Sequence, residues 1–114
     1  MKISRFEDII SWQKSKALSV LIYQTFERDK DFGFRNQIER AAVSVMNNIA
    51  EGFERQTNKE FKQFLFIAKG SCGEVRSMLY LAKELKKITD NDFSKLFSIT
   101  IEISKLLSGF IKTL

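Results

Sequence analysis

The segment from Ile38 to Arg55, IERAAVSVMNNIAEGFER, limits what this chain can fold into more than any other. At about 100° per residue along an α-helix, its apolar and small side chains cover more than half of the circumference. They are Ile38, Ala41, Ala42, Val43, Val45, Met46, Ile49, Ala50 and Phe53. A helix on the surface of a globular protein needs an apolar face of only about 100°. We therefore expect this helix to be covered on two sides, by its own helical bundle and by a second subunit.

The composition excludes several kinds of active site. The chain of 114 residues has no histidine and one cysteine, Cys72. Without histidine it lacks the usual general base near neutral pH and the commonest ligand of transition metals. A single cysteine allows no internal disulfide and no thiolate zinc site. We therefore expect a protein that is not an enzyme, with no cofactor and no metal site.

No part of the sequence is typical of a membrane or secreted protein. No apolar run approaches the roughly 20 residues of a membrane-spanning helix. The N-terminal stretch MKISRFEDII lacks the apolar core of a signal peptide. These features predict a cytoplasmic protein with no membrane partner.

Apolar periodicity and the absence of proline predict four long helices within one domain, residues 1–114. The expected helices are approximately 8–26, 34–55, 58–87 and 91–114. Gly52 is expected to loosen the end of the second helix, and Thr57-Asn58-Lys59-Glu60 matches a capping box that begins the third. Thr89 and the acidic residues after it are expected to cap the fourth helix. Because short connections make neighbouring helices antiparallel, the sequence predicts an all-α, up-down four-helix bundle that forms a homo-oligomer.

The third predicted helix has a regular core stripe in which apolar residues alternate at steps of four and three. The stripe consists of Phe61, Leu65, Ala68, Cys72, Val75, Leu79 and Ala82. This seven-residue repeat is typical of the buried seam of a bundle with coiled-coil-like packing. Since Cys72 lies within the stripe, we expect a buried and unreactive thiol.

A second face of this helix carries small residues. Gly70, Gly73 and Ser77 lie on the same side as Phe66 and Leu81. A glycine inside a helix costs about 1 kcal/mol relative to alanine. Two glycines on one face therefore favour close approach of another backbone, and the alternative is a local weakness that the fold tolerates.

A third face carries a basic stripe, with one cation every seven residues: Lys62, Lys69, Arg76 and Lys83. Lys87 continues it. Residues 57–88 contain seven basic and three acidic residues, so a net +4 of the chain's +5 lies on this helix. Such a row of cations is able to follow a phosphate backbone. The alternative is a solvated face that keeps the protein soluble.

Two pairs of aspartates invite a metal interpretation. Asp29 and Asp31 lie in the charged stretch Glu27–Gly33, and Asp90 and Asp92 lie at the start of the fourth helix. Neither pair is followed by enough oxygen ligands for a calcium-binding loop. We therefore interpret the first pair as part of a solvated loop and the second as helix-capping residues.

The runs QIERAAVSVMNNIAEGFER and EFKQFLFIAKGSCGEVRSMLYLAKEL, together with Trp12-Gln13, Tyr23 and Gly33, resemble the four-helix bundle family known as 23S rRNA intervening-sequence proteins. The resemblance covers nearly the whole chain and implies an up-down bundle that assembles into a homopentameric ring. The chain is also similar to the accessory bundle proteins of diversity-generating retroelements, which bind nucleic acid through a basic surface. The family often has proline where this chain has Met46, so the resemblance implies a milder kink there.

The resemblance also maps the family's polar positions onto this chain. They are Arg40, Asn48, Glu51, Arg55, Ser71 and Glu74. Glu51 and Arg55 are four residues apart on one helix, which is the spacing of an ion pair. We interpret the set as a structural polar network that fixes helix register, and the alternative is an enzyme that uses Glu51 and Glu74 as paired carboxylates.

These observations predict a non-enzymatic, oligomeric helical-bundle protein, with itself as a partner in a homopentamer. Its basic stripe is expected to bind RNA or DNA. The alternative is an oligomeric scaffold or adaptor for a protein partner, with no nucleic-acid role.

Overall fold

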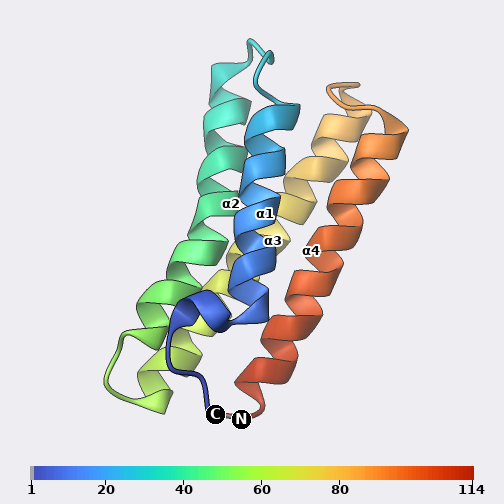
Figure 1. Cartoon of the computed structure of the whole chain (residues 1–114). Coiled ribbons are helices and arrows are strands. Elements are labelled where there is room, and N and C mark those ends of the chain that lie inside the picture. Colours follow the sequence, from blue (N-terminus) through green and yellow to red (C-terminus); the bar gives the residue numbers. More distant parts are fainter. Residues whose placement is uncertain (1) are drawn as a thin grey trace.

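The computed structural model describes residues 2–114, and Met1, the first residue of the predicted domain, lies outside them. The described residues form four α-helices and one 3-10 turn, with no strand. These elements are η1 (Phe6–Asp8), α1 (Ile10–Thr25), α2 (Phe32–Phe53), α3 (Asn58–Glu84) and α4 (Asp90–Ile111). The helices run alternately up and down in a bundle that measures 43 × 22 × 19 Å (Figure 1). The predicted all-α, four-helix arrangement is therefore confirmed.

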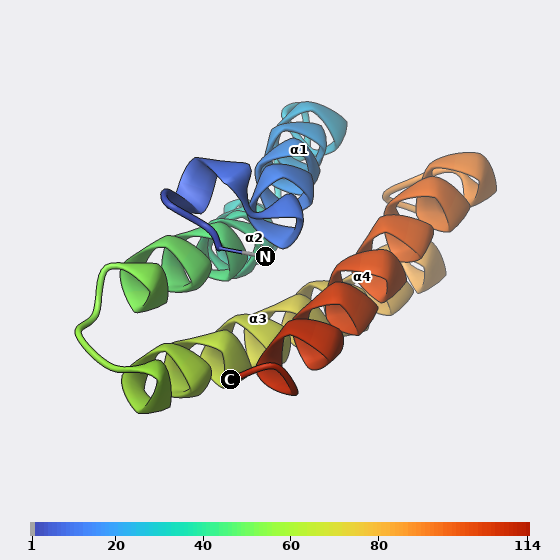
Figure 2. The same ribbon diagram turned by 60° about the horizontal axis from the view of Figure 1, so that its bottom comes forward.

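Each helix packs against two neighbours, in the order α1, α2, α3, α4 around the bundle. The pairing of α2 with α3 is the most extensive, and that of α1 with α4 is the least extensive. Figure 2 shows α1 beside α2 and α3 beside α4. This order decides which side of α3 faces α2 and which faces α4.

The predicted core stripe of α3 is buried along its whole length. Its members are Phe61, Leu65, Ala68, Cys72, Val75, Leu79 and Ala82. Cys72 donates its thiol hydrogen to the carbonyl oxygen of Thr100 on α4, over 3.3 Å. Burial raises the pKa of the Cys72 thiol to about 11, so the reactive thiolate is scarce at neutral pH.

The broad apolar arc of α2 is covered in part within the single chain. α2 packs against α1 on one side and against α3 on the other. Val43, Met46 and Ala50, which widen the arc, are half-buried. Their remaining exposed surface is compatible with the expected second subunit, whose presence stays a prediction.

We expected Gly52 to loosen the end of α2, but in the structure it permits close packing instead. A Cβ atom added at Gly52 would lie 2.6 Å from the Cβ of Phe64 and 3.3 Å from the backbone oxygen of Phe61. Both atoms belong to α3, and the first distance is shorter than real Cβ atoms allow. Glycine at this position lets α2 and α3 approach each other closely.

α2, α3 and α4 each begin directly after a residue whose side chain caps the helix. Thr57 Oγ1 accepts a hydrogen bond from the amide of Glu60 at 3.1 Å, and Thr89 Oγ1 accepts one from Asp92, so both predicted caps are confirmed. α2 begins two residues earlier than expected because Asp31 caps it, accepting from the amide of Phe34.

α3 ends at Glu84, three residues before the predicted end at Lys87. Lys86 adopts a left-handed conformation with a φ of 57°. Its amide donates to the carbonyl of Lys83, and the amide of Lys87 donates to the carbonyl of Ala82 at 2.8 Å. This pair of hydrogen bonds is the Schellman arrangement, in which glycine is the usual left-handed residue.

Replacing Lys86 with glycine is expected to stabilise the fold. The left-handed conformation costs a non-glycine residue about 1–2 kcal/mol, and the extra backbone entropy of glycine offsets about half of that gain. We expect Lys86→Gly to raise the free energy of unfolding by about 0.5–1 kcal/mol, measured by urea denaturation.

Glu84→Gly is the matched control, because Glu84 is the last residue with helical geometry. This change is expected to lower the free energy of unfolding by about 0.5–1 kcal/mol. Equal losses in both variants would show that Lys86 is not in a left-handed turn.

Candidate nucleic-acid interface

The basic stripe lies on the side of α3 that faces α4. Successive members are seven residues apart, which is within about 20° of two full helical turns. Lys83 places its Nζ 4.6 Å from the ring centroid of Phe93 on α4. Lys62, Lys69 and Arg76 are half-buried, and Lys83 is exposed. The four cations therefore form one row beside the junction of α3 and α4.

No carboxylate neutralises this row. Within residues 2–114, no ion pair of 4.0 Å or less includes any of the four cations of the basic stripe. The acidic residue Glu102 of α4 pairs with Lys14 of α1 at 3.1 Å, on the opposite side of α4. The positive charge of the stripe is thus available to an anion in solution.

Lys87 does not continue the stripe, contrary to our expectation. Its Nζ lies 3.0 Å from Asp29 Oδ2, 3.4 Å from Asp31 Oδ2 and 5.0 Å from the ring centroid of Phe34. The side chains of Lys87 and Asp29 are only 14% and 15% exposed. Because α3 has already ended, Lys87 turns away from the stripe and joins the α3–α4 loop to the α1–α2 loop.

The same contacts correct our interpretation of Asp29 as part of a solvated loop. Its carboxylate accepts a hydrogen bond from the amide of Asp31 at 2.9 Å as well as from Lys87. These hydrogen bonds hold the pKa of Asp29 below its ordinary value. The Asp29 carboxylate in turn raises the pKa of Lys87.

An exposed aromatic ring lies beside the basic stripe. Tyr80 is four residues after Arg76 and three before Lys83, and it is 54% exposed. Its ring centroid is 5.3 Å from that of Phe97 and 5.6 Å from that of Phe93, both on α4. Tyr80 was not predicted from the sequence as part of this interface. The available signal was its position between two members of the stripe.

Part of the predicted polar network joins α2 to α3. The hydroxyls of Ser44 and Ser71 are hydrogen-bonded at 2.9 Å. Asn48 donates from Nδ2 to the backbone oxygen of Ser44 at 2.8 Å and to its hydroxyl at 2.9 Å. These three half-buried residues form a small polar link between the two helices. Ser44 was not among the predicted network residues.

The remaining predicted network residues do not belong to this link. Glu74 accepts a hydrogen bond from Gln37 at 3.5 Å. Arg55 pairs with Glu60 at 3.6 Å and lies over the ring of Phe64, 4.9 Å from its centroid. The network therefore divides into separate pairs along the α2–α3 junction.

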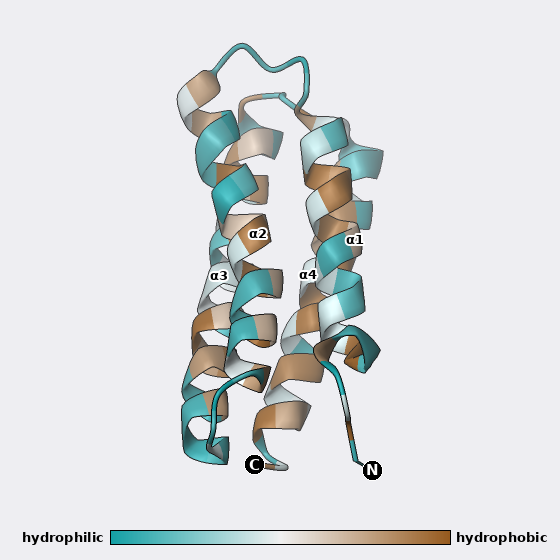
Figure 3. Ribbon diagram, turned by 60° about the vertical axis from the view of Figure 1, so that its left-hand side comes forward, coloured by the Kyte–Doolittle hydropathy of each residue, from teal (hydrophilic) through white to brown (hydrophobic). Residues whose placement is uncertain are grey.

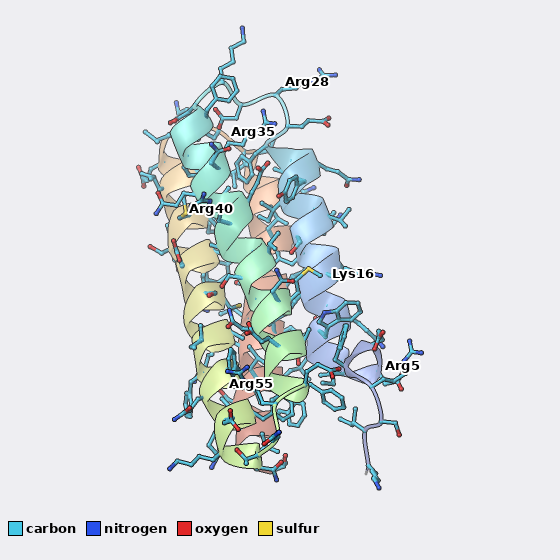
Figure 4. The ribbon with its side chains drawn as sticks, turned by 90° about the vertical axis from the view of Figure 1, so that its left-hand side faces the viewer. Arg5, Lys16, Arg28, Arg35, Arg40 and Arg55 are labelled. Atoms are coloured by element: carbon cyan, nitrogen blue, oxygen red, sulfur yellow. The ribbon has the colours of Figure 1, made fainter. Side chains whose placement is uncertain are left out.

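The predicted pairing of Glu51 with Arg55 is wrong, because Arg55 turns to Glu60 instead. Glu51 and Arg40 are exposed, and neither makes a side-chain hydrogen bond or ion pair within residues 2–114. Figure 4 shows Arg40 on α2 well separated from Arg55, which follows the end of this helix.

A face of α3 turned away from the rest of the bundle is apolar. We call it the outward face of α3: Phe66, Ile67, Gly70, Gly73, Ser77, Leu81 and Leu85. Its four large side chains are about half exposed, at 48–56%. Apolar residues near the α2–α3 loop are visible as brown segments of α3 in Figure 3. A Cβ atom added at Gly70 would have no neighbour within 4 Å, so the predicted close approach is not made inside the chain.

The sequence model of the 23S rRNA-intervening sequence protein family matches residues 7–109. The chain belongs to this family. A crystal structure from the S23 ribosomal protein family of Bacteroides thetaiotaomicron VPI-5482 is similar to it, with a TM-score of 0.85 and 29% sequence identity. The similarity covers 90% of this chain and 99% of that chain, whose protein is described as having unknown function.

No curated protein matches the chain at a significant level. Among residues 2–114, no helix is both long and apolar enough to cross a membrane. The comparisons thus agree with the resemblance expected from the sequence, and they assign no biochemical activity.

The contact between Asp29 and Lys87 makes stability depend on pH. Because the pKa of Asp29 is lowered by folding, its stabilising contribution is fully present above about pH 4 and is lost as the pH falls through its pKa in the fold. Asp29→Asn keeps an acceptor for the Asp31 amide but removes the charge. We expect this variant to be less stable than the wild type at pH 7, with a difference that shrinks below about pH 4.

Urea denaturation at pH 7, 4 and 3 measures this difference. Glu51→Gln is the control, since Glu51 is an exposed carboxylate of α2 without an ion pair in the described chain. It should change stability little at any of these values. Equal stability of Asp29→Asn and wild type at pH 7 would show that the Lys87 contact contributes nothing.

Proposed function

We propose that this 23S rRNA-intervening sequence family protein is a non-enzymatic oligomer that binds RNA or DNA through its basic stripe. The observation that carries the proposal is the row of four cations on α3 without a carboxylate partner in the described chain. At 1.5 Å per residue, the row from Lys62 to Lys83 is about 31 Å long. With a B-form spacing of about 3.4 Å per nucleotide of one strand, it spans roughly nine nucleotides.

α4 supports the same interface. Lys105 and Lys112 are exposed and have no ion pair within residues 2–114. They lie about 80° and 60° around α4 from Phe97, which contacts α3. Glu102 of α4 pairs with Lys14 of α1 instead. The α3–α4 side of the bundle therefore favours an anion more than the α1 side does.

The outward face of α3 supports self-association. Four half-exposed apolar side chains flank glycines that leave room for another backbone. Contiguous apolar surface of this kind commonly marks a protein interface. We propose that a second copy of the chain covers it, in the homopentamer that the family resemblance implies. Five copies of a +5 chain would strengthen the field that attracts nucleic acid.

The same outward face supports the alternative function, an oligomeric scaffold or adaptor for a different protein with no nucleic-acid role. In that case the partner protein would bind apolar surface that the other copies of the chain leave exposed. The two functions differ in what the basic stripe does, because a scaffold needs no free cations on α3.

Reversing the charge of the basic stripe is expected to abolish nucleic-acid binding. The variant carries Lys62→Glu, Lys69→Glu, Arg76→Glu and Lys83→Glu. Salt dependence is the slope of log Kd against log [salt]. Removing one phosphate contact lowers this slope by about 0.9 for duplex DNA or about 0.7 for single strands. Fluorescence anisotropy with labelled oligonucleotides between 50 and 200 mM salt (roughly the range in which such contacts are screened) measures both the affinity and its salt dependence.

A control variant reverses four exposed cations elsewhere: Lys16, Arg28, Lys30 and Arg40. Figure 4 shows Lys16, Arg28 and Arg40 spread over α1, its following loop and α2. The control changes the net charge equally, so it should retain most of the affinity. Equal loss in both variants would indicate attraction by net charge alone, without a defined interface.

Charge on the outward face is expected to separate the subunits. Phe66→Glu with Leu81→Glu places two carboxylates where the proposed second copy packs, and burying such charges without partners is strongly unfavourable. Light scattering should show an oligomer for the wild type and a monomer for the variant. Val20→Glu with Tyr23→Glu, on the exposed side of α1, should leave the mass unchanged. A monomeric wild type would contradict the proposed oligomer.

A further inference from the structure

The proposed function leaves open which form of nucleic acid the basic stripe takes. We propose that it takes a single strand rather than a duplex, with an unpaired base stacked on the ring of Tyr80. This inference rests on the proposed function, because it assigns the substrate class of the same interface.

Tyr80 is in the right place for this role. Around α3, it lies about 40° from Arg76 and about 60° from Lys83. Along the helix axis, it lies about 6 Å from Arg76 and about 4.5 Å from Lys83. A strand whose phosphates contact these two cations therefore has its backbone beside the exposed ring, within reach of a base. Exposed cations alternating with an aromatic side chain are the usual composition of surfaces that bind single strands.

The ring is held by α4 without being covered. The plane of the Tyr80 ring makes angles of 74° with the ring of Phe97 and 55° with the ring of Phe93, so neither phenylalanine stacks parallel on it. The two phenylalanines stack on each other instead, at 5.3 Å and 27°. Because these contacts restrict Tyr80 in advance, a base that stacks on it costs less side-chain entropy on the protein side. The half-exposed ring keeps apolar surface for a flat partner.

The nearest cation is positioned to act together with the ring. Lys83 Nζ lies over Phe93, which itself contacts Tyr80. The ammonium group and the aromatic cluster are thus adjacent on the surface. One nucleotide is able to place its base on Tyr80 and its phosphate near Lys83.

A duplex is able to use the cations but not the ring. Its phosphates reach the basic stripe, whereas its bases are stacked inside the helix and hidden from Tyr80. Single strands expose the flat face of every base, and stacking on an aromatic side chain tolerates any sequence. The interface therefore favours single-stranded DNA or RNA, with little dependence on base identity.

The test compares wild type, Tyr80→Leu and Tyr80→Trp with two fluorescent probes, a single-stranded oligonucleotide and a duplex of the same length. Leucine keeps apolar packing against Phe97 but has no ring on which a base stacks. We expect Tyr80→Leu to weaken single-strand binding by between about 5-fold and 100-fold, since this variant removes the stacking of one base. Its salt dependence should match that of the wild type because the cations remain.

Three further results are expected. Tyr80→Trp should bind the single strand at least as tightly as the wild type, and the duplex should bind Tyr80→Leu as it binds the wild type. Tyr23→Leu, at an equally exposed tyrosine of α1, should have no effect on either probe. A 2-aminopurine base in the single strand should become less fluorescent on binding the wild type but not on binding Tyr80→Leu, because stacking quenches this base.

The inference is overturned if Tyr80→Leu binds the single strand as tightly as the wild type, or if the duplex binds the wild type more tightly than the single strand does. In both cases the basic stripe would still bind nucleic acid, and the proposed function would stand. If neither probe binds the wild type even at low salt, the proposed function fails, and the inference fails with it. A change in subunit number on Tyr80→Leu would place the ring in a subunit interface and also overturn it.

Discussion

The close crossing of α2 and α3 at Gly52 sets the orientation of the helix on which the proposed interfaces lie. An added Cβ at this position would meet Phe64 at 2.6 Å, so no other residue allows the same approach. Farther along the crossing, the Ser44–Ser71 hydrogen bond joins the same two helices. With α2 fixed on one side and α4 on the other, α3 has only one rotation that buries its core stripe. That rotation turns the basic stripe toward α4 and leaves the outward face in solvent.

Three different surfaces then share one helix without competing. The core stripe stabilises the bundle through burial, which needs no specific chemistry beyond shape. The basic stripe keeps its charge because no ion pair within residues 2–114 includes one of its four cations. The Schellman turn at Lys86 directs Lys87 away from the stripe, and Lys87 pairs with Asp29 in the α1–α2 loop. The proposed binding and the fold thus depend on different cations of the same segment.

Patterns within one helix were predictable from the sequence, and contacts between helices were not. The core stripe of α3 follows from its seven-residue repeat, and Thr57 and Thr89 follow from local capping chemistry. The ion pair of Lys87 joins residues 58 positions apart, and no glycine marks the left-handed turn before it. Gly52 looked like a weak helix end because the approach of Phe64 is a tertiary contact. Tyr80 became a candidate only when α4 placed Phe97 beside it.

The central claim is that nucleic acid binds to the α3–α4 side of the bundle. Methyl NMR during titration with a short single strand tests it most directly, because isoleucine and valine mark both sides. Ile101 lies one turn after Phe97 on α4, whereas Ile10 and Val20 are exposed on α1. The predicted result is a shift of the Ile101 methyl signals with little change at Ile10 and Val20. Shifts at Ile10 and Val20 without a change at Ile101 would contradict it.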